Sequence, residues 1–237
     1  MSASFLTVRD LRRQWKPHKE RLSGHPTAIR FHRACSWLDR AEKLDGVADA
    51  DLVLINQWIA LNALYGQWNP QQREPFPDRE SWRDFFDRLL KLDGNGRISG
   101  LLQEHKPLIL TILEDEYLAG FFWKDPTDQN KQVARNLRKK ALSWFVGKEW
   151  TRILDQVLDR IYLQRCQLIH GAATFGGKLN RATLRRTTQM LGHLLPAVLQ
   201  VLIDYGADAD WGALCYPPMQ ANPDARNGVK YRPGLPR

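Results

Sequence analysis

Arg165 and His170 stand five residues apart near the end of a long, apolar-patterned segment, and their types suit acid–base chemistry. A histidine has an unperturbed pKa of about 6.5, so it can take up or release a proton at neutral pH. An arginine keeps its charge and presents a planar fork of donors to anionic oxygens. Together the two side chains could transfer a proton beside a phosphate group while stabilising the negative charge that develops on it.

A long helix is expected to carry both residues. The segment 148–169 places apolar residues at helical spacing, and Gly171 is expected to end the helix. Arg165 follows Ile161 by four residues and so falls on the apolar stripe, where an arginine is costly unless it is paired or faces a second surface. Five residues of an ideal helix separate Arg165 and His170 by about 140°. A break at the glycine, or a partner subunit, must then bring the two groups together.

Other interpretations of these residues remain open. Arg13 and His18 have the same separation, so the spacing alone is a weak signal. Arg165 could form a buried salt bridge, and His170 could bond the last carbonyls of its helix, without either taking part in chemistry. Asn62 could hydrogen-bond Arg165 or His170, or it could be a satisfied core asparagine.

A candidate phosphate site follows the pair in the chain. The small-residue loop 171–177 leads to a predicted helix that begins at Asn180 and reaches about residue 204. Free N–H groups, the helix dipole and nearby cations at such a helix start favour an anion. Phe175 in the loop could stack on a base. The residues expected to bind phosphate are Lys178, Asn180, Arg181 and Arg185.

The net positive charge is concentrated in one segment of the chain. The 237 residues include 35 Lys and Arg and 26 Asp and Glu, which gives a net charge of +9. Residues 121–186 hold 14 basic and 5 acidic residues, so the remainder of the chain is neutral. A basic excess around Arg165 and His170 favours a nucleic-acid backbone as partner. RNA carries its own nucleophile, the 2′-hydroxyl, so a proton-transferring histidine and a charge-stabilising arginine suit RNA better than DNA.

Several classes of protein are excluded by composition and motifs. Three cysteines, Cys35, Cys166 and Cys215, are odd in number and lack a CxxC pair, which argues against a disulfide framework or a zinc site. The apolar stretch 191–203 is too short for a membrane span, and the first residues lack the apolar region of a secretory signal. Common nucleotide-binding and hydrolase motifs are absent. We therefore expect a cytoplasmic protein that uses no metal or cofactor and contacts no membrane.

The apolar pattern predicts helices throughout and an all-α fold. One helical domain is expected over 1–216, with helices within 1–48 packing on it or extending it, followed by a poorly ordered tail rich in Pro, Gly and Arg over 217–237. Three prolines predict a loop over 67–78, and Pro107 and Gly120 divide 98–124 into two short helices. The remaining predicted helices cover 27–45, 51–66, a short segment around 82–90, a basic segment 127–145, 148–169 and 180–204.

Two runs of residues carry a resemblance to a known family. The run RCQLIHGAATFGGKLNR over 165–181 resembles the HEPN superfamily of helical domains, whose mark is R-x(4–6)-H near the end of a long helix. It looks especially like bacterial, toxin-like members, and WIALNALYG over 58–66 is similar to the helix that packs against the motif in such proteins. The resemblance spans about 58–211. Family members usually carry a polar residue directly after the arginine, and in this sequence Cys166 occupies that supporting position.

The resemblance implies a HEPN-like helical bundle with additional helices and a metal-independent endoribonuclease. Two R-x4-H motifs of a homodimer would form one cleft, in which the RNA 2′-hydroxyl attacks the phosphate. His170 would act as general acid or base, and Arg165 would stabilise the phosphorane. The implied role is a toxin or effector in phage defence or a toxin–antitoxin system, so an antitoxin or another defence protein is a further expected partner.

Two alternatives remain at this point. The first is a HEPN-like module that binds RNA or a protein without cutting. The second is a helical DNA-binding regulator, which is disfavoured because no helix-turn-helix spacing stands out.

Overall fold

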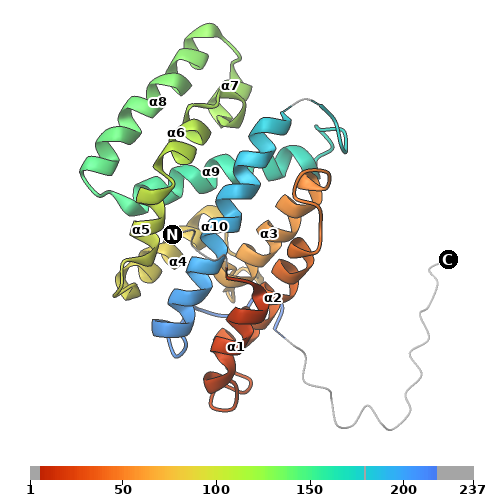
Figure 1. Ribbon diagram of the computed structural model, residues 1–237, viewed down its shortest axis with the longest axis vertical. Coiled ribbons are helices and arrows are strands. Elements are labelled where there is room, and N and C mark those ends of the chain that lie inside the picture. Colours follow the sequence, from red (N-terminus) through yellow and green to blue (C-terminus); the bar gives the residue numbers. More distant parts are fainter. Residues whose placement is uncertain (1–5, 179, 218–237) are drawn as a thin grey trace, which may run out of the picture.

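The long helix α10 (Arg181–Tyr205) runs through the middle of the molecule in the computed structural model, which describes residues 6–178 and 180–217 (Figure 1). Fourteen of its 25 residues are buried, including the consecutive residues 197–199, so neighbours cover the helix on more than one side. Pro196 lies inside this helix and does not end it. The helix contacts α1, α3, α4, α5, α6 and α9 and therefore organises the bundle.

The described residues form ten α-helices, one 3-10 turn and a two-stranded ladder, which confirms the predicted all-α fold. None of these helices, within the described ranges, is both long and apolar enough to cross a lipid bilayer. Of the expected tail over 217–237, only Pro217 lies within the described residues. The elements before α10 are α1 (Val8–Lys19), α2 (Pro26–Glu42), α3 (Ala50–Tyr65), β1 (Trp68–Asn69), β2 (Glu74–Pro75), α4 (Asp78–Leu92), α5 (Arg97–Glu104), α6 (Lys106–Glu114), η1 (Glu116–Leu118), α7 (Gly120–Lys124), α8 (Asp128–Val146) and α9 (Trp150–Ile169).

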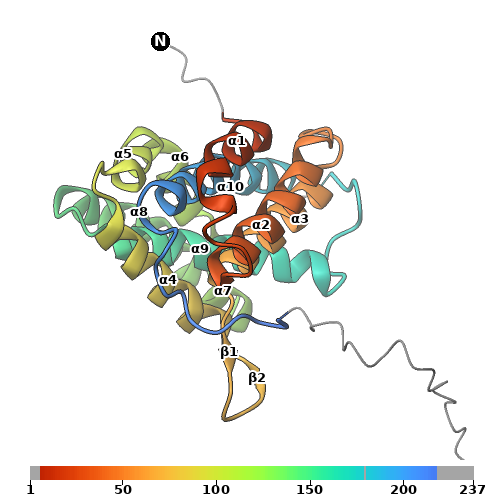
Figure 2. The same ribbon diagram turned by 90° about the horizontal axis from the view of Figure 1, so that it is seen from below.

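Two segments differ from the sequence-based prediction. The expected loop 67–78 contains the ladder β1–β2, an antiparallel pair in which Trp68 faces Pro75 and which projects from the bundle (Figure 2). The ladder has only two residues per strand, too few for a hydrophobic alternation to be read from the sequence. The segment 98–124 holds α5, α6, η1 and α7 rather than two helices. Pro107 stands in the first turn of α6, where its missing N–H costs nothing, so it begins a helix instead of breaking one.

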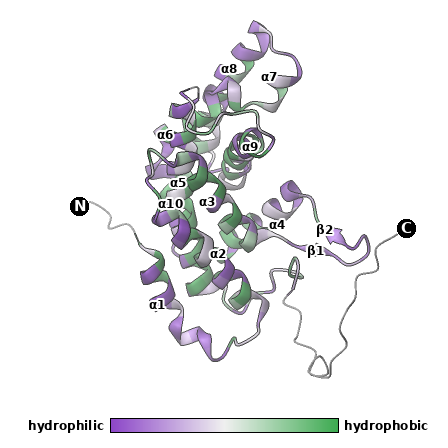
Figure 3. Cartoon of the chain, turned by 90° about the vertical axis from the view of Figure 1, so that its right-hand side faces the viewer, coloured by the Kyte–Doolittle hydropathy of each residue, from purple (hydrophilic) through white to green (hydrophobic). Residues whose placement is uncertain are grey.

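The helices pack in groups around α10. Helices α2 and α3 lie side by side on one flank, while α6, α8 and α9 form another group (Figures 1 and 2). Buried apolar side chains from nine of the ten described α-helices join in one core cluster, and Phe122 of α7 belongs to a small separate cluster with Ala119 and Ala134. In Figure 3 the hydrophobic stretches of the ribbon gather mainly in the middle of the bundle.

Four aromatic rings join α3, α4 and α9. Trp58 and Tyr65 come from α3, Trp82 from α4 and Tyr162 from α9, and the centroids of the contacting ring pairs are 5.6–6.2 Å apart. The Trp82 indole donates to Asp155 on α9 at 3.1 Å, so the polar edge of this ring is also satisfied. The cluster fixes the position of the second half of α9, which carries the candidate site.

Arg30 on α2 connects the end of the described chain to α3. The residue is 1% exposed, and its guanidinium donates to the carbonyls of Leu64, Gly66, Trp211, Gly212 and Ala213 at 2.6–3.2 Å. Burial lowers the pKa of Arg30 to about 10. Five carbonyl acceptors compensate for burying the charge without a carboxylate, so the segment 211–213 is held against the end of α3.

Replacement of Arg30 by methionine should destabilise the fold by about 3 kcal/mol or more, because it leaves several buried carbonyls without a donor. Arg33, one turn later on α2, is the matched control, since it donates to Cys215 and Tyr216 carbonyls at a more exposed position. Urea unfolding should show a loss of less than about 1 kcal/mol for Arg33→Met. Equal losses in the two variants would contradict the assigned role of Arg30.

Candidate functional site at the end of helix α9

Helix α9 ends as the sequence predicts, at Ile169, with His170 as its cap and Gly171 in the left-handed conformation at a φ of 70°. The Gly171 N–H donates to the Leu168 carbonyl at 3.2 Å, and the Ala172 N–H donates to the Gln167 carbonyl at 2.8 Å. These two bonds form a Schellman motif, which satisfies carbonyls left free by the end of a helix. A glycine suits the left-handed position because it has no Cβ.

Arg165 is half-buried and lies against aromatic surface. Its guanidinium carbon is 5.7 Å from the centroid of the Tyr162 ring, and its Nη1 is 3.8 Å from the Cys166 sulfur. Among the described residues, no carboxylate forms an ion pair with Arg165. The positive charge of Arg165 also acts on Tyr65. Burial and the Asp78 carboxylate raise the pKa of Tyr65, and Arg165 opposes that rise. The Tyr162 ring therefore positions the Arg165 guanidinium, which remains available to an external anion.

His170 is exposed, and its backbone N–H donates to the carbonyl of Cys166 at 2.9 Å. No hydrogen bond joins His170 to Arg165 within the described part of the chain. Because His170 continues the helical backbone with φ −87° and ψ 10°, the glycine does not turn its side chain back toward Arg165. One chain thus carries the two groups near the same end of α9 without joining them.

The buried stripe of α9 differs from the predicted one. It continues from Ile161 through Gln164, which is 3% exposed, and includes Arg160 at 4%, whereas Arg165 lies beside it. The prediction that Arg165 sits on the buried stripe is therefore wrong by about one residue position on the helix. The sequence spacing could have indicated this buried stripe, because Val157, Arg160 and Gln164 follow one another at intervals of three and four residues.

Arg160 is a structural arginine. It donates to the Leu113 carbonyl at the end of α6 at 3.2 Å, and its guanidinium carbon is 5.8 Å from the centroid of the Phe121 ring. Burial lowers the pKa of Arg160 to about 10. The side chain therefore joins α9 to α6 and α7 on the face away from Tyr162.

The loop after α9 is tied to the start of α3 by one carboxylate. Asp51 accepts from Arg181 Nη1 at 2.7 Å and from the Gly176 N–H at 3.1 Å, and Arg181 also donates to the Ala48 carbonyl at 3.3 Å. The Asp51 and Arg181 side chains are 10% and 17% exposed. Arg181, predicted to bind phosphate, is thus already paired, and its main role in this chain is to fix the loop.

The other predicted phosphate ligands differ in availability. Asn180 precedes α10 at the predicted cap position, but its left-handed backbone, at a φ of 59°, gives no side-chain capping bond. Lys178 and Arg185 are both exposed, and neither has an ion pair among the described residues. Lys178 and Asn180 also line an open groove of about 580 Å³ beside Arg135 of α8. Acidic residues of α6 and η1 share that groove, so its charge is mixed.

The supporting residues predicted from the sequence make other contacts. Asn62 donates to the Tyr65 hydroxyl and to Asp78, each at 3.0 Å, and the hydroxyl donates to the same Asp78 oxygen at 2.9 Å. Asn62 therefore belongs to a polar cluster next to the aromatic rings and does not bond Arg165 or His170. Cys166 contacts Arg165, as noted above, and lies one helical turn before His170.

A pocket of about 610 Å³ opens between the end of α9, the loop 172–178, the start of α10 and α7. We call it the α9–α10 pocket. Its walls include Leu163, Leu168, Leu184 and Trp123, and its polar groups include Gln164 and Lys178. Among the described residues, no group of three or more His, Cys, Asp or Glu side chains is arranged to hold a metal ion.

Replacement of Asp51 by asparagine should loosen the loop, because it removes the charge partner of Arg181. Hydrogen exchange at the Gly176 amide should become at least about tenfold faster. Asp208→Asn is the control, since Asp208 forms an exposed ion pair with Arg21 at the far end of the molecule. Unchanged exchange in the loop of Asp51→Asn would show that other contacts hold it.

Comparisons with known proteins give no match: no family model, no curated protein and no solved structure resembles the chain at a significant level. The residues and geometry described above are thus the basis for proposing a function. They consist of a free half-buried arginine, an exposed histidine at a helix end, and an adjoining pocket.

Proposed function

We propose that the protein is a metal-independent endoribonuclease of HEPN type, in which Arg165 and His170 act on a phosphodiester of RNA. One observation carries the proposal. Arg165 is half-buried without a carboxylate partner among the described residues, and a histidine follows it at the exposed end of the same helix. A partly desolvated arginine without a counter-ion is costly, and an anionic substrate offsets that cost.

The two side chains have distinct roles in the proposed reaction. The RNA 2′-hydroxyl attacks the adjacent phosphorus, and the bond to the 5′-oxygen of the next nucleotide breaks. His170 removes the hydroxyl proton or protonates the leaving oxygen, and Arg165 binds the phosphorane oxygens, whose negative charge rises during attack. Tyr162 holds the guanidinium in place by contact with its ring.

A second copy of the chain would supply the second proton-transfer group. Base and acid roles require two proton-transfer groups, and each chain supplies His170 for one of them. Ile169 at the end of α9 and Phe175 in the following loop are 53% and 65% exposed, and such apolar side chains suit an interface between copies. We propose a homodimer through the α9 ends that acts in the cytoplasm as a toxin or effector. An antitoxin or another defence protein would control it.

The same exposed apolar side chains favour one alternative, a module that binds RNA or a protein without cutting. Such a module would retain its binding when Arg165 or His170 is replaced, provided the surface is intact. Cleavage assays therefore separate the two functions.

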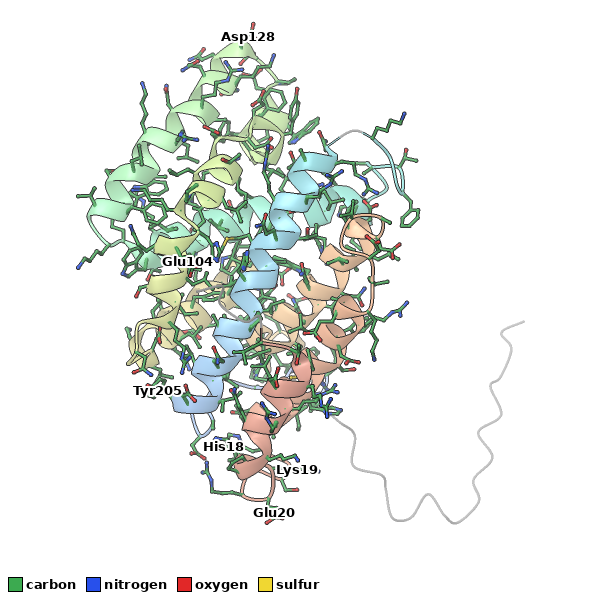
Figure 4. The ribbon with its side chains drawn as sticks, in the orientation of Figure 1. His18, Lys19, Glu20, Glu104, Asp128 and Tyr205 are labelled. Carbon is green, nitrogen blue, oxygen red and sulfur yellow. The ribbon has the colours of Figure 1, made fainter. Side chains whose placement is uncertain are left out.

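Arg165→Ala and His170→Ala should each reduce RNA cleavage in excess chelator by about 10²–10⁴-fold, as expected for loss of charge stabilisation or of a general acid–base group. Arg13→Ala and His18→Ala are matched controls, because they repeat the residue types and spacing on α1. Arg13 pairs with Asp10 at 3.0 Å, and His18 lies at the opposite end of the molecule from the loop that follows α9 (Figure 4). The controls should cleave as wild type.

Retained cleavage in both site variants, at wild-type rates and with normal folding, would refute the assigned residues. Absence of cleavage by the wild-type chain on structured and unstructured RNA, with RNA binding still present, would favour the binding module.

Mixing the wild type with an excess of the His170→Ala protein should lower the cleavage rate per wild-type chain by about tenfold or more, because a mixed dimer keeps only one of the two proton-transfer histidines. Specific activity of the wild type should also fall on dilution below the dimer dissociation constant. Full activity from a monomer at nanomolar concentration would falsify the composite site while leaving the residue assignment open to the variant assay above.

A further inference from the structure

We infer that the α9–α10 pocket binds one nucleotide of the RNA, with a base that carries an exocyclic amino group seated beside Gln164. This inference rests on the proposed RNA-directed function and adds a base-recognition site to it. The pocket volume of about 610 Å³ lies within the range of small-molecule sites. The pocket combines apolar walls, a rim cation and a buried amide, which are the features that hold a nucleotide.

A chain of hydrogen bonds fixes which atom of Gln164 is free. Gln167 Nε2 donates to the Tyr117 carbonyl at 3.1 Å, so the Gln167 oxygen faces Gln164. Gln164 Nε2 donates to that oxygen at 3.3 Å. Gln164 Oε1 is then a buried acceptor without a hydrogen-bond partner in the described part of the chain, although the residue is only 3% exposed and lines the pocket. Such an atom favours a ligand that brings a donor.

The free acceptor selects the kind of base. Adenine, cytosine and guanine present an exocyclic amino group, which donates to an amide oxygen. Uracil presents carbonyl oxygens on both sides of its ring N–H, and these repel Gln164 Oε1. The ring N–H is the only donor on this edge of uracil, and the flanking oxygens oppose its approach to Gln164 Oε1, so the acceptor favours a base whose donor is a protruding amino group.

Trp123 provides an aromatic surface at the pocket. Its side chain is 52% exposed, and its indole N–H donates to the Tyr117 carbonyl at 2.9 Å, the same carbonyl that orients Gln167. An exposed ring held by a hydrogen bond is suited to stacking against a base, a contact that RNA-binding proteins use for unpaired nucleotides. Leucine side chains in the pocket lining add further apolar surface.

The phosphate end of the nucleotide would lie at the rim. Lys178 lines the pocket next to the start of α10, a helix of 25 residues with no acidic residue in its first turn. Arg181 is neutralised by Asp51, so Lys178 is the cation that remains for the phosphate. The Lys178 ammonium and the N-terminus of α10 together favour an anion at this position.

The pocket and the proposed reacting pair use different parts of α9. Residues 163, 164, 167 and 168 line the pocket, whereas Arg165 contacts Tyr162 and Cys166. The seated base is therefore not the site of the reaction. It belongs to a nucleotide near the cleaved bond, whose identity would set sequence preference.

Titration of the wild-type protein with AMP, UMP and adenosine, followed by calorimetry and tryptophan fluorescence, tests the inference. AMP should bind at least about tenfold more tightly than UMP, and adenosine should bind more weakly than AMP because it lacks the phosphate. Lys178→Ala should remove the difference between AMP and adenosine. Equal binding of AMP and UMP by the wild type, or no binding of either at millimolar concentration, would overturn the inference.

Two variants separate base recognition from a general loss of folding. Gln164→Leu keeps the side-chain volume and should lower AMP affinity to that of UMP. Trp123→Ala changes an exposed ring and should weaken both nucleotides, whereas Trp37→Ala, at a similar exposure of 42% on α2, should weaken neither. Preference for AMP that survives Gln164→Leu in a folded protein would contradict the role of Gln164.

Binding and cleavage of a short RNA, measured beside AMP binding, distinguish failure of this inference from failure of the proposed function. His170→Ala should retain the AMP preference, because it leaves the pocket intact. If AMP binds with the expected preference and short RNA is bound but not cut, the proposed ribonuclease fails alone. If RNA is cut by His170-dependent chemistry without any effect of Gln164→Leu on base preference, the pocket inference fails alone.

Discussion

The contact of the Trp58, Tyr65, Trp82 and Tyr162 rings is the constraint on which the candidate site depends. It joins α3, α4 and α9, and it supplies the surface on which Arg165 rests. Aromatic pairs of this kind contribute about 0.5–1.5 kcal/mol each beyond the area they bury. The arginine is therefore placed by packing, and its donors stay free for a ligand.

The second anchor lies on the opposite side of the α9 end. Asp51 joins the start of α3 to the loop and to the first residue of α10 through two hydrogen bonds. Because the loop is tied in this way, the small residues after Gly171 form the wall of a pocket. The aromatic cluster and the Asp51 contacts thus hold the end of α9, with Arg165 against the rings and the α9–α10 pocket lined by other residues of the helix.

The sequence predicted the helices and the end of α9 well, because these follow from local signals. Apolar spacing is repeated over many residues, and Gly171 adopts the left-handed backbone that ends a helix. The pairing of Arg181 with Asp51 could not be predicted, since 130 residues separate them and many carboxylates compete. Arg30 and Arg160 were missed for a related reason: their acceptors are backbone carbonyls, which leave no mark in the sequence.

The central claim is that RNA supplies its own nucleophile and that the chain transfers the proton. The most direct measurement is the chemistry of the product ends, with an RNA that contains one 2′-deoxynucleotide at the cleaved position as the comparison. The account predicts 2′,3′-cyclic phosphate and 5′-hydroxyl ends in the presence of chelator, and no cleavage at the deoxy position. Products with 3′-hydroxyl and 5′-phosphate ends, or cleavage that ignores the missing 2′-hydroxyl, would contradict it.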